Sequence, residues 1–404
     1  MKILQLFNRF PWPLRDGGAI ANYHESMGYL KVGAELCMAS LNTSKHFIKY
    51  EDIPEDLRNR AQIHLSYIDN EVKPKDALLN LFSDSSYHVD RFISKDFEIL
   101  LAEICQNNTF DVVIFESVFM APYLPIIRQH TKALCVLREH NVEYKIWENL
   151  AAHCKFSLKR KYLQLLAERL KRFELTVVNS FDAITVFSLD DLVMLREDYC
   201  QVPIEVFPVG IDVDNFVINQ ENLEMPSLFH LGSMDWMPNQ EAMKWFIEEV
   251  WYDINAEFPD LHFYLGGRNL PTHFFDFNNQ NNIRVVGEVE NAHDFMNSKA
   301  IMIVPLFSGS GIRVKILEGM ALGKCVISTK LGAQGIVAKP GQEILYAEDE
   351  EQFIEQITYL MENPEQVARI GRNARELVKK RYDNKTIILE KLNYYSRIID
   401  RIRG

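Results

Sequence analysis

Short, largely apolar runs alternate with longer segments of helical periodicity through the first half of the chain. The runs lack regular polar alternation, which is typical of strands that are covered on both faces. They lie at residues 3–7, 36–41, 63–68, 110–116, 133–137, 182–187 and 204–208. Helical patterns separate most of these runs, so the alternation predicts a parallel, doubly wound α/β sheet. In such sheets, ligands bind beyond the carboxyl ends of the strands.

The alternation resumes after a stretch that has no apolar period. Residues 213–226 carry Asn, Gln, Glu and a proline, which indicates a linker between two domains. Further strands are predicted at residues 228–231, 261–265, 283–286, 300–306, 325–328 and 343–347. We therefore expect an N-terminal domain over 1–212, a C-terminal domain over 227–385 and an amphipathic terminal helix over 386–404.

The segment from Ala300 to Thr329 is the most informative stretch. It predicts a buried strand, a Ser-Gly-Ser-Gly loop, a helix over about 313–322 and a second buried strand. Arg313 and Lys315 stand at the start of this helix, where the helix dipole makes each cation cost about 0.3–1 kcal/mol. An anion in the mouth of the loop would remove that cost, which points to a phosphate or diphosphate site. A strand–helix–strand unit with solvated charges explains the same pattern, and both interpretations stay open here.

Two features of the same helix extend the first interpretation. Lys315 and Glu318 are three residues apart and share one side of the helix, while Ile316, Leu317 and Met320 face the core. A carboxylate one turn behind a diphosphate is well placed to accept hydrogen bonds from ribose hydroxyls. Glu318 is therefore a candidate ribose ligand.

The N-terminal half carries two further candidate sites. Gly17 and Gly18 lie between the first strand and a helix, an arrangement that can bind an anion, although a tight turn alone also explains it. The polar cluster that contains His140 follows the strand at 133–137. A lone histidine is more often structural than functional, but a position at the end of a strand in this fold favours a role at the ligand site.

Composition and charge narrow the function classes. The 404 residues carry a net charge of −12, so no general basic field exists to hold a nucleic-acid backbone. The six cysteines form no C-x-x-C pair, and several lie in apolar segments, which favours buried free thiols in a reducing compartment. The sequence shows no metal-ligand spacing, no run of 18 apolar residues, and a start too short and polar for a signal peptide. We expect a cytoplasmic protein.

The candidate phosphate loop carries a resemblance to a known family. Gly311, the Leu-Glu-Gly-Met-Ala run at 317–321, Gly323 and the Val-Ile pair at 326–327 resemble the donor-site motif of the family-4 retaining glycosyltransferases. The chain departs from that motif at Ser310, where the family usually has a glutamate that contacts the donor sugar. A branch of the family with the pattern GSG-x-R-x-K-I-L-E is similar to this chain throughout.

The resemblance implies a GT-B fold, in which two doubly wound Rossmann-like domains face each other across a cleft and a C-terminal helix crosses back to the first domain. It implies transfer of a hexose-type sugar from a nucleotide-diphosphate sugar to a glycan or lipid-linked acceptor, with retention of configuration and without a metal cofactor. Cell-surface polysaccharide or glycoconjugate synthesis is the expected setting. The serine at position 310 supports one alternative, a catalytically impaired nucleotide-sugar-binding partner, and a nucleotide-sugar epimerase of the same fold is another.

The resemblance and the residue patterns together give three sets of site residues. Most family members place an Arg and a Lys in the loop that here contains Ser233 and Pro238, so Arg313 and Lys315 are inferred to supply the diphosphate countercharge instead. The expected catalytic residues are His140, Arg313 and Lys315; the expected donor-binding residues are Gly18, Val289, Ser310, Gly311, Ile312 and Glu318; the candidate sugar or acceptor residues are Asn141, Glu143, Trp236 and Asn239.

Residues 155–172 form a basic amphipathic segment. One interpretation is a peripheral contact with the anionic inner face of a membrane, where a lipid-linked acceptor would lie. The other is a long helix that packs on the sheet through its leucines. The two are compatible, because one face could pack while the other contacts lipid headgroups.

Overall fold

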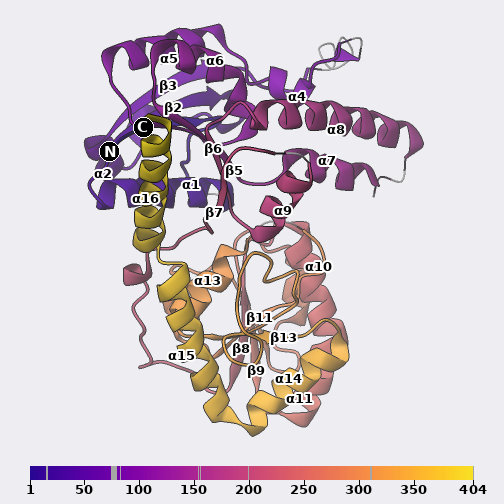
Figure 1. Cartoon of the computed structure of the whole chain (residues 1–404). Coiled ribbons are helices and arrows are strands. Elements are labelled where there is room, and N and C mark those ends of the chain that lie inside the picture. The colour runs from indigo at the N-terminus through magenta and orange to yellow at the C-terminus, as the bar shows by residue number, and fades with distance from the viewer. Residues whose placement is uncertain are drawn as a thin grey trace. The chain divides into compact units, whose positions relative to one another are not determined.

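The computed structural model describes residues 1–14, 17–73, 80–81, 83–152, 154, 156–198, 200–309 and 312–403. The chain divides into two compact units. The first unit comprises Met1–Gly210 together with Ile387–Gly404, and the second comprises Ile211–Thr386 (Figure 1). Each unit is built around one parallel sheet, which confirms the predicted pair of doubly wound α/β domains.

The sheet of the first unit has the strand order β3-β2-β1-β4-β5-β6-β7, and all neighbouring strands are parallel. The order reverses between β1 and β4, which is the switch point of a doubly wound sheet. The strands are β1 (Lys2–Phe7), β2 (Glu35–Thr43), β3 (Ala61–Ile68), β4 (Val112–Phe115), β5 (Leu134–Glu139), β6 (Ala183–Val186) and β7 (Ile204–Val206). Strands β4, β5 and β6 are buried along their whole length, as their apolar runs predict.

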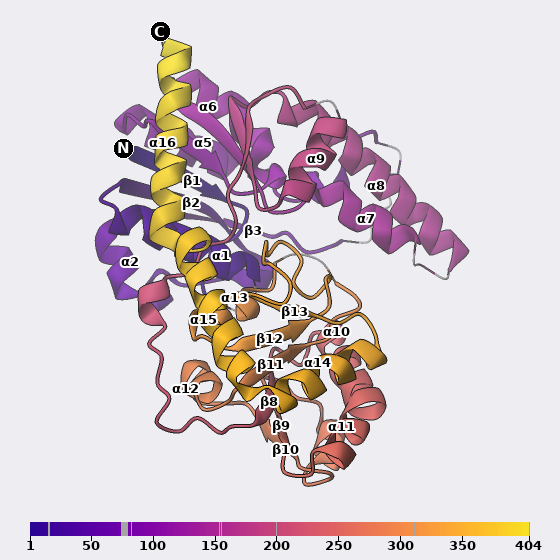
Figure 2. The ribbon, with the colours of Figure 1, turned by 60° about the horizontal axis from the view of Figure 1, so that its bottom comes forward.

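Helices cover both faces of this sheet. The helices of the first unit are α1 (Gly17–Lys31), α2 (Glu55–Arg60), α4 (Tyr87–Asp90), α5 (Lys95–Asn107), α6 (Leu124–His130), α7 (Glu143–Ala152), α8 (Ser157–Val178), α9 (Leu189–Glu197) and α16 (Asn384–Arg403). One core packs side chains of α5, α6 and α8 against the sheet, and the other packs side chains of α1, α2 and α16 against the opposite face. The C-terminal helix α16 therefore lies on the same face as α1 (Figure 2).

The sheet of the second unit has the order β10-β9-β8-β11-β12-β13, again all parallel. Its strands are β8 (Ser227–Leu231), β9 (His262–Gly266), β10 (Ile283–Gly287), β11 (Ile301–Val304), β12 (Cys325–Ser328) and β13 (Leu345–Tyr346). Its helices are α10 (Met237–Trp245), the π-helix η5 (Phe246–Trp251), α11 (Tyr252–Glu257), α12 (Ala292–Asn297), α13 (Val314–Ala321), α14 (Glu350–Glu362) and α15 (Pro364–Arg381).

Several local expectations can be compared with this architecture. Gly323, which follows the C-cap Leu322 of α13, has a φ of +70°, as expected for a left-handed C-terminal cap. Residues 213–226 belong to the second unit, where the backbone N–H of Asn219 donates to Oδ1 of Asn297 at 3.2 Å. The helical stretch from Met237 to Glu257 was not predicted from the sequence, and it is interrupted by a π-helical turn.

Two further features of the chain are the state of its cysteines and the apolar character of its helices. All six cysteines are free, and each is buried except Cys154, which is partly exposed. In the described part of the chain, no helix combines the length and apolar character that a membrane span requires.

Candidate functional site

The second unit gathers polar side chains at the carboxyl ends of its central strands. Lys315, in the first turn of α13, donates from Nζ to Oδ1 of Asn239 at 3.0 Å. The same Nζ lies 3.2 Å from Nε2 of His230, the penultimate residue of β8. His230 Nδ1 lies 2.8 Å from the carbonyl oxygen of Ile303 on β11. Because a carbonyl can only accept, Nδ1 carries the proton and the Nε2 lone pair accepts from Lys315.

Both described partners of the Lys315 ammonium are neutral. Complete burial of His230, together with the Lys315 charge, lowers the pKa of this imidazole well below its usual value. Burial, aided by repulsion from Arg313, lowers the pKa of Lys315 to about 7. Among the described residues, no carboxylate forms an ion pair with this lysine. The ammonium thus sits in a site that lacks a described countercharge and would gain from an anion.

Arg313 is the N-cap of α13 and lies against an aromatic ring. Its guanidinium carbon is 4.8 Å from the centre of the Trp236 ring, which is a cation–π contact. Burial lowers the pKa of Arg313 to about 10. Arg313 therefore stays charged at neutral pH, and the Trp236 ring fixes its direction.

Glycines allow the loops to close around these side chains. Gly309 has a φ of +101°, and a Cβ there would lie 2.6 Å from Cζ2 of Trp236 and 2.9 Å from Nη2 of Arg313. Gly267, directly after β9, has a φ of +148°, and a Cβ there would lie 1.7 Å from the carbonyl oxygen of Gly232. At Gly267 any side chain would push the two loops apart, whereas at Gly309 it would strain the backbone and displace the side chains of Trp236 and Arg313. The glycines therefore let the backbone of these loops run close to Arg313 and Lys315.

The other residues that were expected to bind the donor lie in several parts of the structure. Glu318 lies on α13, one turn after Lys315, and burial raises the pKa of its carboxyl. Ile312 packs beside Gly335, whose ideal Cβ position is 3.4 Å from it. Val289 lies in the loop after β10. Ser310 and Gly311 fall outside the described residues, and Gly18 is the second residue of α1 in the first unit.

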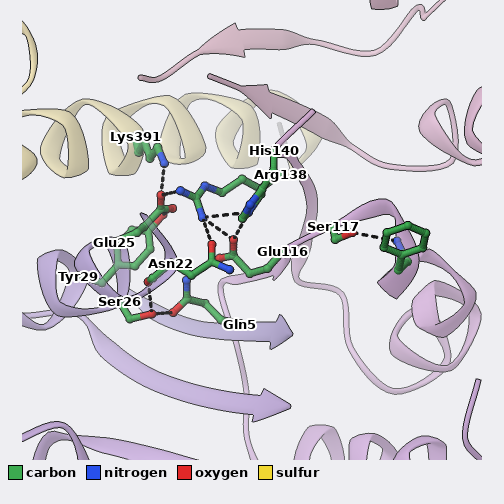
Figure 3. Close-up of polar contacts among 11 residues, drawn as sticks. Gln5, Asn22, Glu25, Ser26, Tyr29, Glu116, Ser117, Arg138, His140 and Lys391 are labelled. Carbon is green, nitrogen blue, oxygen red and sulfur yellow. Dashed lines mark hydrogen bonds and ion pairs between the residues drawn. The ribbon is translucent and has the colours of Figure 1, made fainter. Parts of the chain in front are cut away.

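A buried network of charges lies beside His140 in the first unit (Figure 3). Arg138, on β5, pairs through Nη1 with Oε2 of Glu116 at 2.6 Å and through Nη2 with Oε2 of Glu25 at 2.7 Å. Lys391 of α16 lies 2.5 Å from the same oxygen of Glu25. Burial of Glu116 would raise the pKa of its carboxyl, but Arg138 and His140 outweigh that effect and lower it.

His140 follows directly after β5 and lies at the edge of this network. Its Nε2 is 3.5 Å from both Glu116 Oε2 and Arg138 Nη1, and its ring packs 5.1 Å from the ring of Phe187. Burial lowers the pKa of His140, although Glu116 opposes that shift. The imidazole is therefore neutral at pH 7, with one nitrogen available to a ligand.

Asn141 and Glu143 follow His140 at the start of α7. The carboxylate of Glu174, on α8, accepts hydrogen bonds from the backbone N–H groups of Glu143 and Tyr144, both at 3.1 Å. These hydrogen bonds satisfy two backbone donors at the first turn of α7. Burial raises the pKa of Glu143 to about 7 and that of Glu174 to about 8. Glu143 is therefore partly protonated near neutral pH.

The structure brings Trp236, Asn239, Arg313 and Lys315 into one cluster, which supports treating them as one site. Sequence reasoning missed His230, which lies within an apolar strand and looks structural there. It also missed the partners of Arg138. Polar residues in the first and terminal helices and at the end of the strand at 110–116 were visible in the sequence, but such positions do not reveal their partners.

Within the part of the chain that the structure describes, no group of three or more His, Cys, Asp and Glu side chains is arranged to hold a metal ion.

Comparison with known proteins identifies the architecture. Residues 225–363 match the family described as glycosyl transferases group 1. The chain is 24% identical, over 301 residues, to an uncharacterized 44.6 kDa protein in the cps region of Klebsiella pneumoniae, which covers 71% of this chain and 74% of that protein.

Solved structures give the same picture for the whole chain. HepE from Anabaena, in complex with UDP, superposes with a TM-score of 0.66 at 14% identity, over 98% of this chain and 100% of that one. Sucrose-phosphate synthase from Thermosynechococcus elongatus gives a TM-score of 0.69 at 14% identity, over 99% and 100% of the two chains. These comparisons support a GT-B glycosyltransferase: the chain has the GT-B fold, and its second unit contains the segment that matches glycosyl transferases group 1.

Proposed function

We propose that this protein transfers a hexose-type sugar from a nucleotide-diphosphate sugar to an acceptor, with retention of configuration. The observation that carries the proposal is the pair of cations at the start of α13, Arg313 and Lys315. They lie within the segment that matches glycosyl transferases group 1, and the described partners of Lys315 are neutral. A diphosphate would supply a countercharge to Lys315, whose described partners carry none.

The N-terminus of α13 and its two cations both favour a bound diphosphate. The positive end of α13 favours an anion at its first turn, where Lys315 is located. Binding of the diphosphate raises the pKa of Lys315 and keeps its ammonium protonated. We propose that Glu318 then accepts hydrogen bonds from the ribose, and that the backbone near Val289 contacts the base, as the resemblance to family 4 implies.

Charge develops on the leaving phosphate when the glycosidic bond of the donor breaks. Arg313 and Lys315 would stabilise that charge in the transition state more than in the ground state, which is the requirement for catalysis. In this proposal no divalent metal is needed, because two side chains supply the positive charge. His140 would contact the donor sugar through its neutral imidazole, and Asn141 and Glu143 would border the acceptor.

The acceptor is proposed to be a glycan or a lipid-linked saccharide. The relative from Klebsiella pneumoniae lies in a cps region, and this supports a role in cell-surface polysaccharide synthesis. Ser310, at the position of the usual glutamate, favours one competing function, a nucleotide-sugar-binding partner without turnover.

The test is a ligand screen and a transfer assay on the full chain. We expect at least one of UDP, GDP, ADP, CDP and dTDP to raise the melting temperature with EDTA present, because a ligand of the native state stabilises it. The matching sugar donor should be consumed only with an acceptor, and NMR of the product should show the donor's anomeric configuration. Nucleotide binding without turnover across a broad acceptor panel would favour the partner function, and release of an altered free sugar would favour an epimerase.

A peripheral membrane contact is a further part of the proposal. At the start of α8, Phe156 is 75% exposed and Leu158 is 83% exposed, and three exposed cations, Lys159, Arg160 and Lys161, follow directly. Further along the helix the leucines at 163, 166 and 170 are buried against the unit. The helix therefore packs against the rest of the first unit through its later turns, and its first turn offers an apolar and basic tip to an anionic bilayer.

Replacing both Phe156 and Leu158 with serine is expected to weaken binding to phosphatidylglycerol vesicles by more than about tenfold, because each buried apolar side chain contributes about 1.5–3 kcal/mol. Co-sedimentation with vesicles measures this. Val217→Ser, which removes another strongly exposed apolar side chain, is the matched control and should bind as the wild type does. Equal binding of all three proteins, or of wild type to phosphatidylcholine and phosphatidylglycerol alike, would contradict the contact.

A further inference from the structure

The buried network of the first unit joins four segments that are distant in sequence. Lys391 on α16 contacts Glu25 on α1 at 2.5 Å, Glu25 contacts Arg138 on β5 at 2.7 Å, and Arg138 contacts Glu116, which follows β4, at 2.6 Å (Figure 3). None of these four side chains is more than 5% exposed. Two cations and two carboxylates therefore balance one another away from water, and this balance is what makes burial of each charge tolerable.

The last carboxylate of the series also faces His140. Glu116 Oε2, which pairs with Arg138, is 3.5 Å from His140 Nε2. Its other oxygen accepts a hydrogen bond from Gln5 Nε2 at 2.6 Å, and Gln5 in turn accepts from Ser26. The carboxylate is thus held from both sides, and its direction toward the imidazole depends on Arg138 staying in place.

We propose that Lys391 is a positioning residue for His140: by sharing Glu25 with Arg138, the C-terminal helix leaves Arg138 free to hold the Glu116 carboxylate against the imidazole. In this arrangement α16 covers the sheet and also supplies the charge of Lys391, which His140 requires for its proposed contact with the sugar. The proposal rests on the proposed function in giving His140 a ligand, but its structural part can be tested without any substrate.

The charges that act on His140 come from several elements. Glu116 and Arg138 face it from the sheet and Glu25 from α1, while Tyr29 donates to Glu25 at 2.9 Å and Lys391 and Tyr395 approach from α16. If Lys391 is replaced with methionine, two carboxylates remain against one cation. The surplus negative charge favours the imidazolium, and at an effective dielectric constant of about 20 we expect the His140 titration to move up by about one pH unit.

The experiment is an NMR titration of the full chain labelled with 13C-histidine, in which His140→Gln assigns the resonance. Lys391→Met should raise the His140 midpoint by about one unit, and Lys391→Arg should keep it near that of the wild type. Lys385→Met, which removes an exposed lysine of the same helix, is the matched control and should leave the midpoint unchanged. A folded Lys391→Met protein with the wild-type midpoint would overturn the proposal.

A double variant keeps the test decisive if Lys391→Met folds poorly. Glu25→Gln with Lys391→Met restores neutrality, because Arg138 and Glu116 remain as a pair, and it should return the His140 midpoint to near the wild-type value. A raised midpoint in this double variant would equally overturn the proposal. In transfer assays, the acidic limb of the kcat profile should move with the midpoint, while the KM for the donor stays the same. A midpoint that moves in a protein without any transfer activity would reject the proposed function alone.

Discussion

Replacing Lys315 with alanine is expected to lower kcat/KM for the sugar donor by about 100- to 1,000-fold, the usual cost of removing one preorganised group that stabilises developing charge. The reason lies in the surroundings of the ammonium. It is held by Asn239 and by the neutral His230, and none of its described partners is a carboxylate, so the ammonium can serve a bound anion. Initial rates over a range of donor concentrations measure the loss, and the stabilisation by the nucleoside diphosphate should fall in parallel.

The matched control for this variant is Lys244→Ala. Lys244 lies on α10 in the same unit, is exposed, and pairs with Glu248 at 3.9 Å on the helix surface. Its removal should leave kcat/KM within about twofold of the wild-type value, because exposed pairs contribute little. If Lys315→Ala transferred sugar as fast as Lys244→Ala, Lys315 would have no role at the phosphate.

Replacing Arg138 with methionine should reduce the free energy of unfolding by about 3–5 kcal/mol at pH 7, which is typical when one member of a buried ion network is removed. Glu25 and Glu116 then share only Lys391 as a cationic partner. In the variant the pKa of Glu116 rises, because Arg138 no longer opposes the effect of burial, so the penalty is full at neutral pH and shrinks as the pH falls and this carboxyl takes up a proton. Urea unfolding at pH 7 and pH 5 measures both effects.

The control is Arg128→Met, which removes a bidentate pair at the surface. Arg128 binds both carboxylate oxygens of Asp182, at 2.9 and 2.8 Å, but its side chain is 39% exposed. We expect this change to cost about 1 kcal/mol or less. Equal losses for the two arginine variants would show that the buried network contributes no more than a surface pair.

The two sheets could be predicted because each buried strand is a short apolar run. A short apolar run between two helices is compatible with few structures other than a buried strand. Gly323 could be placed as a cap for a similar reason, since its local signal depends only on neighbouring residues. The cations of α13 were identified because their cost at a helix start is a local property. Their neighbours Trp236 and Asn239 were selected as candidates for a sugar pocket, and in the structure they lie against Arg313 and Lys315.

The features that were not predicted from the sequence depend on contacts between distant segments. His230 and Lys315 are 85 residues apart, and Glu25 and Lys391 are 366 residues apart, so no local pattern links them. The helical stretch after Trp236 was missed because aromatic and β-branched residues weaken its helical signal, and burial of Phe246, Ile247 and Trp251 compensates for that weakness.

Proton uptake on nucleotide binding tests the central claim most directly. Titration calorimetry at pH 8, in two buffers that differ in ionisation enthalpy, counts the protons taken up when the nucleoside diphosphate selected by the screen binds. The phosphate itself is already ionised at this pH, since its second pKa is about 6. The pKa of Lys315 is about 7 in the free protein, so binding of the diphosphate should protonate this lysine. We predict uptake of most of one proton by the wild type and none by Lys315→Met; binding without proton uptake, or with equal uptake by both proteins, would contradict a diphosphate at Lys315.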